Sequence, residues 1–180
     1  MNGAGKLEPG RIEAIIREAT HGVFSTMLNL PVEDLPAYEE MASEPPSSLD
    51  GVEVLVGIGG LWTGTGRIWC SSKFACTLAS SLLTTEYDAL NEDVLDAISE
   101  VANMIVGNVK ARLEDILGLL ALSIPTVIFG QNYRTRSAGV TSWLVVPFQC
   151  GDQELQVRFF IMAATGVNPM IARPQLVHTA

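Results

Sequence analysis

Five polar or small residues recur along residues 94–113 at the spacing of one face of an α-helix. They stand at i, i+4, i+7, i+11 and i+14, as Asp96, Glu100, Asn103, Gly107 and Lys110. Apolar residues occupy much of the remaining circumference and can face a core. A carboxylate and an amide three residues apart share one surface, and the glycine one turn further on has no side chain. The spacing predicts a small reactive site on a helix face.

Each residue of this face also has an ordinary structural explanation. A lone exposed Glu100 is most often a solvated charge, and an Asn103 within a helix is most often a surface residue. Asp96, near the start of the helix, can simply favour the helix dipole. Gly107 costs roughly 1 kcal/mol relative to alanine in a helix. Either the approach of another protein's backbone or close packing on a neighbouring helix would account for that cost.

The composition is that of one globular domain. Of the 180 residues, 48% are hydrophobic and 17% are charged, and the net charge is −9. The chain has no cluster of lysine and arginine, which argues against nucleic acid and anionic membranes as partners. No apolar stretch reaches the roughly 20 residues that span a bilayer, and the N-terminus lacks the apolar core of a signal peptide. These features predict a cytoplasmic protein without a membrane segment.

Metal and disulfide chemistry are not expected. The three cysteines form no Cys-x-x-Cys pair and have no histidine nearby in the sequence, so three buried thiols are the better interpretation. The Glu18–His21 spacing has no third ligand, and a histidine on a helix surface explains it better than a metal site does. The sequence therefore predicts neither a metal nor a cofactor bound by the chain itself.

Hydrophobic periodicity predicts three helices and five strands. The helices cover residues 11–28, 71–83 and 94–113, and the strands cover 52–58, 59–71, 126–132, 139–150 and 154–163. Ser71 or Ser72 and Asn91 are expected to cap the second and third helices. Glycine-rich residues 57–60 indicate a turn, Gly151–Asp152 a hairpin turn, and proline-bearing residues 31–49 a loop or an edge connection.

One domain over residues 11–165 is predicted, with a flexible leader at 1–10 and an irregular tail at 166–180. Residues 13–28 align without gaps with residues 96–111, which indicates a weak internal repeat. In this alignment Arg17 stands opposite Glu100, so the first copy lacks the acid, and Thr20 stands opposite Asn103. Two similar amphipathic helices are expected to pack side by side on one sheet, as a two-layer α+β sandwich with a largely antiparallel sheet.

The helix face, together with a proline beyond it, resembles a known family signature. The pattern Asp96-x3-Glu100-x2-Asn103-x21-Pro125 is similar to that of the CheC/CheX/FliY chemotaxis phosphatases, which have Asp or Ser, x3-Glu-x2-Asn and then about x22-Pro. Residues 66–83 look like the family's strand-then-helix segment, and the C-terminal strand hairpin also has a counterpart. The resemblance covers roughly residues 11–163. One motif copy in a short chain resembles CheX most closely and implies a CheX-like (CheC-like) fold.

The resemblance implies a phosphatase that hydrolyses the aspartyl phosphate of a CheY-like response regulator. Asn103 would hold the attacking water and Glu100 would engage the regulator's lysine, with Asp96, Gly107 and Pro125 in supporting roles. Phosphoryl transfer depends mainly on positioning, and an amide can both donate to and accept from water without titrating near neutral pH. The Mg2+ would belong to the phosphorylated partner.

The same resemblance implies a homodimer joined through sheet edges, with residues 139–163 as the expected exposed strands. Two other functions stay open. One is a non-catalytic, CheC-like interaction module that binds a response regulator or a motility component. The other is a structural subunit of the CheC/FliY type, although the sequence predicts a single domain, without the extra flagellar-switch domain that such a role would favour.

Overall fold

A computed structural model describes residues 8–41, 49–135 and 139–164. The described helices are α1 (Pro9–Val23), which a short π-helical segment η1 (Phe24–Leu28) continues, α2 (Ser72–Leu83) and α3 (Glu92–Leu117). The strands are β1 (Glu33–Asp34), β2 (Tyr38–Met41), β3 (Leu49–Gly60), β4 (Trp62–Cys70), β5 (Leu120–Leu122), β6 (Thr126–Tyr133), β7 (Ser142–Cys150) and β8 (Gln153–Ala163). None of these helices combines the length and apolar character needed to cross a membrane.

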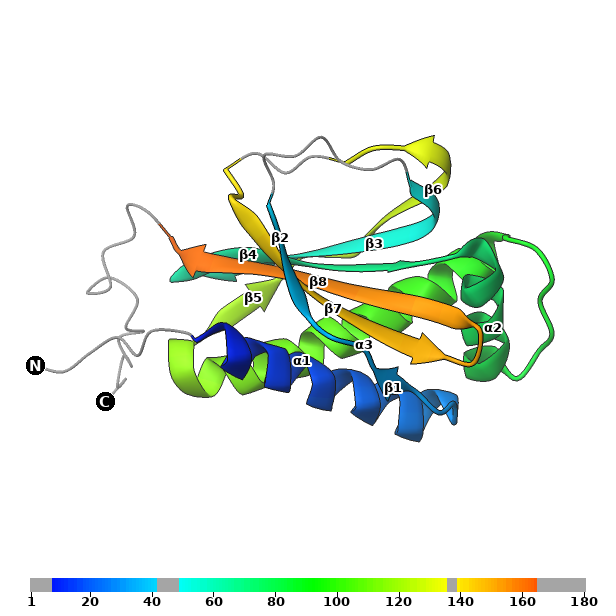
Figure 1. Ribbon diagram of the computed structural model, residues 1–180, viewed down its shortest axis with the longest axis horizontal. Helices are drawn as coiled ribbons and strands as arrows, with labels where there is room; N and C mark the ends of the chain where they lie inside the picture. The colour runs from blue at the N-terminus through cyan, green and yellow to red at the C-terminus, as the bar shows by residue number, and fades with distance from the viewer. Residues whose placement is uncertain (1–7, 42–48, 136–138, 165–180) are drawn as a thin grey trace, which may run out of the picture.

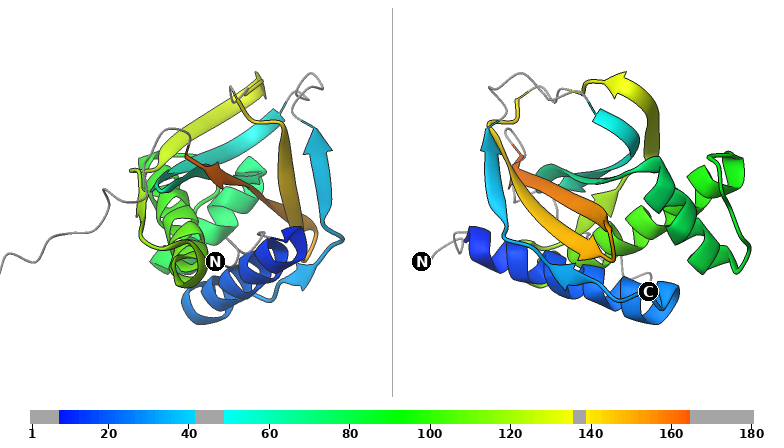
Figure 2. Two further views of the ribbon diagram at one scale, coloured as in Figure 1. Left: turned by 90° about the vertical axis from the view of Figure 1, so that its left-hand side faces the viewer. Right: turned by 45° about the vertical axis from the view of Figure 1, so that its right-hand side comes forward.

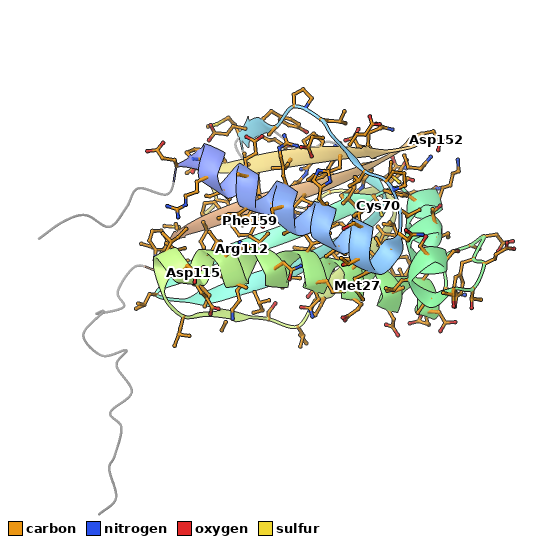
Figure 3. All side chains as sticks on the ribbon, turned by 90° about the horizontal axis from the view of Figure 1, so that it is seen from below. Met27, Cys70, Arg112, Asp115, Asp152 and Phe159 are labelled. Atoms are coloured by element: carbon orange, nitrogen blue, oxygen red, sulfur yellow. The ribbon has the colours of Figure 1, made fainter. Side chains whose placement is uncertain are left out.

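The strands form one antiparallel sheet in the order β1-β7-β8-β4-β3-β5, with β2 also pairing with β7 and β6 with β3. The helices lie together against one face of this sheet, and β6 stands away from them where the sheet curls (Figures 1 and 2). α1 and α3 run side by side beneath the strands (Figure 3). The prediction of a two-layer α+β fold is confirmed.

The core fills the space between the helices and the sheet. Alternate residues of the long strand β3 point into it, and α1 and α3 contribute the apolar stripes opposite; fully buried examples are Val52, Val54, Val56, Ile16, Ile98 and Ile105. Burying each such side chain contributes about 1.5–3 kcal/mol. In β4, Gly66 lets α3 come close, because a Cβ at this position would lie 2.7 Å from Val106 Cγ2.

Both predicted helix caps are present. The Ser71 Oγ accepts a hydrogen bond from the Phe74 N–H at 3.1 Å, and the Asn91 Oδ1 accepts one from the Val94 N–H at 2.9 Å. α1 begins at Pro9, inside the segment predicted as a leader, because proline suits the first turn of a helix, where its missing N–H is not needed. Residues 1–7 and 165–180 lie outside the described residues.

The glycine-rich residues 57–60 are not a turn. They continue β3, and the chain reverses at Leu61 before β4. Gly60 has a φ of 134°, and a Cβ there would lie 2.9 Å from the Leu119 carbonyl oxygen. The glycine therefore admits the backbone entering β5, which pairs with this end of β3. The glycine cluster reflects strand pairing that is distant in sequence, and local turn patterns could not reveal it.

The prediction that residues 139–163 form an exposed sheet edge is wrong. β8 lies between β7 and β4, and the outer side of β7 pairs with β1 and β2, with Tyr38 opposite Val145 and Glu33 opposite Gln149. Residues 33–41 fold back onto the sheet and cover this edge, as the predicted edge connection allowed. Within the described residues, the outermost strands are β1 and β2 on one side and β5 and β6 on the other. A homodimer stays a prediction, and sheet pairing would have to use these strands.

The sheet also buries charge on the side away from the helices. Arg67 of β4 and Glu53 of β3, exposed by only 4% and 0%, form an ion pair at 2.9 Å, and Thr135 hydrogen-bonds to both. The Arg67 guanidinium lies over the Trp143 ring, 5.0 Å from its centroid. Removing either partner would leave an uncompensated buried charge, which is strongly destabilising. The strand patterns alone did not indicate this pair.

Candidate functional site

The predicted polar stripe lies on the outer face of α3. Asp96 and Glu100 are exposed, and Asn103, Gly107 and Lys110 are half-buried. The opposite side of the same helix is buried in the core through residues such as Ile98, Ala102, Ile105, Val109 and Leu113. The helix is long enough to hold this face rigidly, and Asn91, Glu92 and Asp93 stabilise its N-terminus. Folding therefore fixes α3 and leaves its stripe accessible to a partner.

Glu100 and Asn103 are available for intermolecular contacts. Within the described residues, neither side chain has a hydrogen-bond or ion-pair partner. They lie three residues apart, so they are neighbours on the helix surface. An exposed carboxylate can accept hydrogen bonds from a cation, and the half-buried, unpaired amide next to it can orient a water molecule. Neither needs to break an existing interaction first.

Lys110, the last residue of the stripe, is already paired. Its Nζ lies 2.8 Å from the Glu114 Oε1, and that oxygen also accepts a hydrogen bond from the Leu120 N–H at 2.9 Å. The hydrogen bond from Leu120 and the lysine hold the pKa of the Glu114 carboxyl below its usual value. Lys110 therefore helps to join the end of α3 to β5, and the open part of the stripe runs from Asp96 to Gly107.

Gly107 has open space around it. A Cβ built at this position meets no atom within 4 Å, apart from the immediate neighbours and the helix's own backbone. Close packing on a neighbouring helix was one of the two explanations for this glycine, and it is wrong. The half-exposed surface at Gly107 lies one turn beyond Asn103.

Pro125 does not lie on α3, the helix that carries the stripe. It ends the short connection between β5 and β6, and β6 begins at Thr126, as expected for a proline that precedes a strand. In the same connection Ser123 accepts a hydrogen bond from the Gly57 N–H at 2.9 Å. Asp96, Glu100, Asn103 and Gly107 thus share one helix face, and Pro125 belongs to the sheet side of the fold.

The sister helix α1 has no comparable face. Arg17 forms ion pairs with Glu13 at 2.8 Å and with Asp34 at 3.0 Å, and its guanidinium donates to the Leu35 carbonyl oxygen at 2.8 Å. Thr20 is fully buried. Arg17, which corresponds to Glu100, therefore joins α1 to the β1 segment, and Thr20, which corresponds to Asn103, lies in the core.

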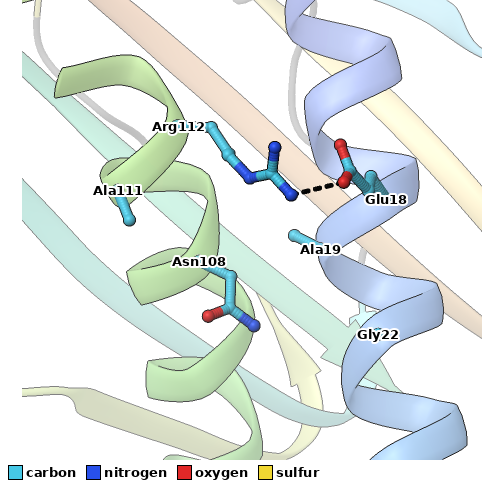
Figure 4. A pocket seen from close by; sticks show the side chains of 6 residues that line it. All are labelled: Glu18, Ala19, Gly22, Asn108, Ala111 and Arg112. Atoms are coloured by element: carbon cyan, nitrogen blue, oxygen red, sulfur yellow. Dashed lines mark hydrogen bonds and ion pairs between the residues drawn. The ribbon is translucent and has the colours of Figure 1, made fainter. Parts of the chain in front are cut away.

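A groove runs between α1 and α3 beyond the stripe, and sequence reasoning did not anticipate it. Its volume is about 330 Å3, and Glu18, Ala19, Gly22, Asn108, Ala111 and Arg112 line it. The Arg112 guanidinium donates to the Glu18 carboxylate across the two helices (Figure 4). Small residues on both helices were the available signal, but only the packing of α1 against α3 brings them together.

In the part of the chain that the structure describes, no three His, Cys, Asp or Glu side chains gather in a way that could hold a metal ion. Glu18 and His21 do not converge on a common ligand site. Glu18 pairs with Arg112, and the His21 ring lies 2.9 Å from the Asp34 carboxylate. The groups at α3 that could take part in a reaction are the carboxylate of Glu100 and the amide of Asn103, both unpaired in the described structure.

The fold is that of known chemotaxis proteins. The crystal structure of the chemotaxis protein CheX from Desulfovibrio desulfuricans matches with a TM-score of 0.74 and 24% identity, over 84% of this chain and 99% of that one. A CheX–CheY–BeF3–Mg2+ complex from Borrelia burgdorferi contains a similar chain, with a TM-score of 0.69, 25% identity, and coverage of 87% and 99%. These matches identify the fold as that of the CheX/CheC-like class.

Sequence comparison gives the family. The model for the chemotaxis phosphatase CheX matches residues 52–149, and the chain belongs to the CheX family. The CheY-P phosphatase CheX of Thermotoga maritima is 30% identical over 102 residues. That match spans 53% of this chain and 66% of the relative. The resemblance inferred from the α3 motif is confirmed, and the roles of its individual residues stay predictions.

Proposed function

We propose that this protein hydrolyses the aspartyl phosphate of a CheY-like response regulator and thereby ends a chemotaxis or related two-component signal. The observation that carries the proposal is the open Glu100–Asn103 pair on α3 of a CheX-family chain. The CheX–CheY complex among its structural neighbours supports a regulator as the partner.

In the proposed reaction, Asn103 holds a water molecule in line with the phosphorus atom of the aspartyl phosphate. The amide oxygen accepts a hydrogen bond from the water, and the amide N–H2 can donate to a phosphoryl oxygen. Catalysis of this kind works by positioning, since phosphoryl transfer leaves little covalent chemistry to the protein. The water oxygen bonds to phosphorus as the bond to the aspartyl oxygen breaks, and inorganic phosphate leaves.

Glu100 has the complementary task of engaging the regulator. Its exposed carboxylate can pair with the lysine ammonium of the regulator's phosphorylation site, which orients the two proteins so that Asn103 meets the phosphate. Asp96, exposed one turn earlier, adds negative charge to the same face. The Mg2+ and the leaving carboxylate are contributed by the regulator, so the chain would need no cofactor of its own.

The experiment is to add the purified protein to a phosphorylated CheY-like regulator with Mg2+ and to follow phosphate loss over time. Acceleration that scales with the protein concentration is expected. Binding without acceleration would replace the enzyme by the non-catalytic interaction module. Absence of both, with a regulator from the same organism, would contradict the proposal.

A further inference from the structure

We infer that Gly107 is a clearance residue, which leaves the surface over Asn103 bare so that the rim of the regulator's phosphorylation site can reach α3. This inference rests on the proposed function and extends it to a residue that fixes how closely the partner can dock. The fold itself does not require a glycine at position 107.

A glycine inside a helix is costly, because it loses more backbone freedom on folding than any other residue. Gly107 lies within α3, which continues without interruption from Glu92 to Leu117. It therefore neither starts nor ends the helix. Its φ is not positive, in contrast to Gly118 with a φ of 78° at the end of the same helix. The conformational freedom of glycine is thus used at position 118 and not at position 107.

Packing does not require the glycine either. A Cβ at position 107 meets nothing within 4 Å, whereas one at Gly66 would lie 2.7 Å from Val106. The two glycines, which lie on elements that pack against each other, therefore have different roles. Gly66 is needed to seat α3 on the sheet, and Gly107, on the outer side of α3, would accept a side chain without displacing anything in the protein.

The position explains what a side chain at 107 would obstruct. Side chains on a helix lean toward its N-terminus and cover the surface over the preceding turn. A side chain at position 107 would therefore lie over Asn103, and around the helix axis it falls between Asn103 and Glu100. The asparagine side chain is short, so its amide reaches a partner's phosphate only if the partner's surface comes close to the helix.

The chemistry of the occupant follows from these neighbours. The surface must carry a phosphorylated carboxylate for Asn103 and a cation for Glu100, with the surrounding loops close enough to rest on the bare turn at Gly107. A phosphorylated regulator domain has these features.

The test uses three variants of the full chain with a phosphorylated CheY-like regulator and Mg2+. Gly107→Ala and Gly107→Leu both place good helix formers at an open site, so each should raise the melting temperature, by about 2–4 °C for alanine. The same variants should lose docking, with KM for the regulator rising several-fold for alanine and at least tenfold for leucine. Asn108→Ala is the matched control: Asn108 is exposed and adjacent, about 100° around the helix, and its KM should stay within twofold.

A rise in stability together with a loss of docking would separate clearance from a structural role. If Gly107 were needed for the structure, its variants would lose both stability and docking. A stable Gly107→Leu variant with wild-type KM and wild-type affinity would overturn the inference while leaving the proposed function intact. If the wild-type protein binds the regulator without hydrolysis, the dissociation constants of the same variants decide the question. If it neither binds nor hydrolyses, the proposed function fails first and the inference fails with it.

Discussion

α1 and α3 are weakly similar in sequence and lie side by side on one sheet, yet the residues at corresponding positions differ in exposure and in contacts. In α3, Glu100 is exposed and Asn103 is half-buried, and both are without partners in the described structure. In α1, Arg17 is held by two carboxylates and Thr20 is fully buried. A repeated helix can therefore keep its core-facing pattern while only one copy keeps a surface that is open to a partner.

The difference arises from what covers each helix. Residues 33–41 return along β7, and Asp34 and Leu35 reach the side of α1 that carries Arg17. No described segment covers the Glu100 side of α3 in this way. The candidate site therefore depends on uncovered surface as much as on the identity of two residues.

Asn103→Ala should produce the largest functional change. Loss of the amide leaves the attacking water unpositioned, and poor positioning of a reacting group can cost about 100-fold in rate. We expect at least that loss in dephosphorylation of the regulator, with binding retained. Thr20→Ala, the corresponding change in α1, should leave the rate unchanged. A near-wild-type rate for Asn103→Ala would remove its proposed role, and a large loss in Thr20→Ala would contradict the choice of helix.

Transplanting the α3 pair into α1 tests the comparison directly. The double variant Arg17→Glu/Thr20→Asn should gain no second site, because position 20 is buried and position 17 faces Glu13 and Asp34. It should lose on the order of 2–4 kcal/mol of unfolding free energy, since it buries an amide and brings like charges together. Denaturant unfolding and the dephosphorylation rate measure both effects, and a doubled rate would refute the structural contrast.

Glu100→Ala should weaken docking and rate together. A charge-assisted hydrogen bond to a partner contributes about 1.5–3 kcal/mol, so affinity for the phosphorylated regulator should fall about tenfold or more. Because the side chain has no partner within the described chain, the melting temperature should stay near the wild-type value. Titration calorimetry and thermal unfolding check the two expectations, and a fall in stability with unchanged binding would assign Glu100 to the fold.

Thr20→Val should have the smallest effect. The Thr20 Oγ1 is buried and has no hydrogen-bond partner in the described structure, so replacing the hydroxyl by a methyl removes an unfavourable buried polar atom. We expect stability within about 0.5 kcal/mol of wild type, or slightly higher, and an unchanged rate. Marked destabilisation would indicate that the Thr20 hydroxyl forms a hydrogen bond in the folded protein, contrary to the structure.

Much of the fold could be predicted because its signals are local. The 3.6-residue periodicity, the Ser71 and Asn91 caps and the Gly151–Asp152 hairpin turn depend on neighbours a few residues apart. The predicted turn at 57–60 is wrong because these glycines continue β3, and Gly60 admits the backbone of β5 from about 60 residues away. The predicted exposed edge at 139–163 is wrong because residues 33–41 pair with β7 and cover it.

The spacing of Asp96, Glu100 and Asn103 could be read from the sequence alone, because helical periodicity places these residues on one face wherever the helix lies. Together with Pro125 and the flanking segments, this pattern carried the resemblance to the CheX family. The three-dimensional packing was needed to show that this face is open, that its counterpart in α1 is covered, and that Gly107 is not needed for packing. Exposure depends on which distant segments return over a helix, and contacts of that kind leave no periodic trace in the chain.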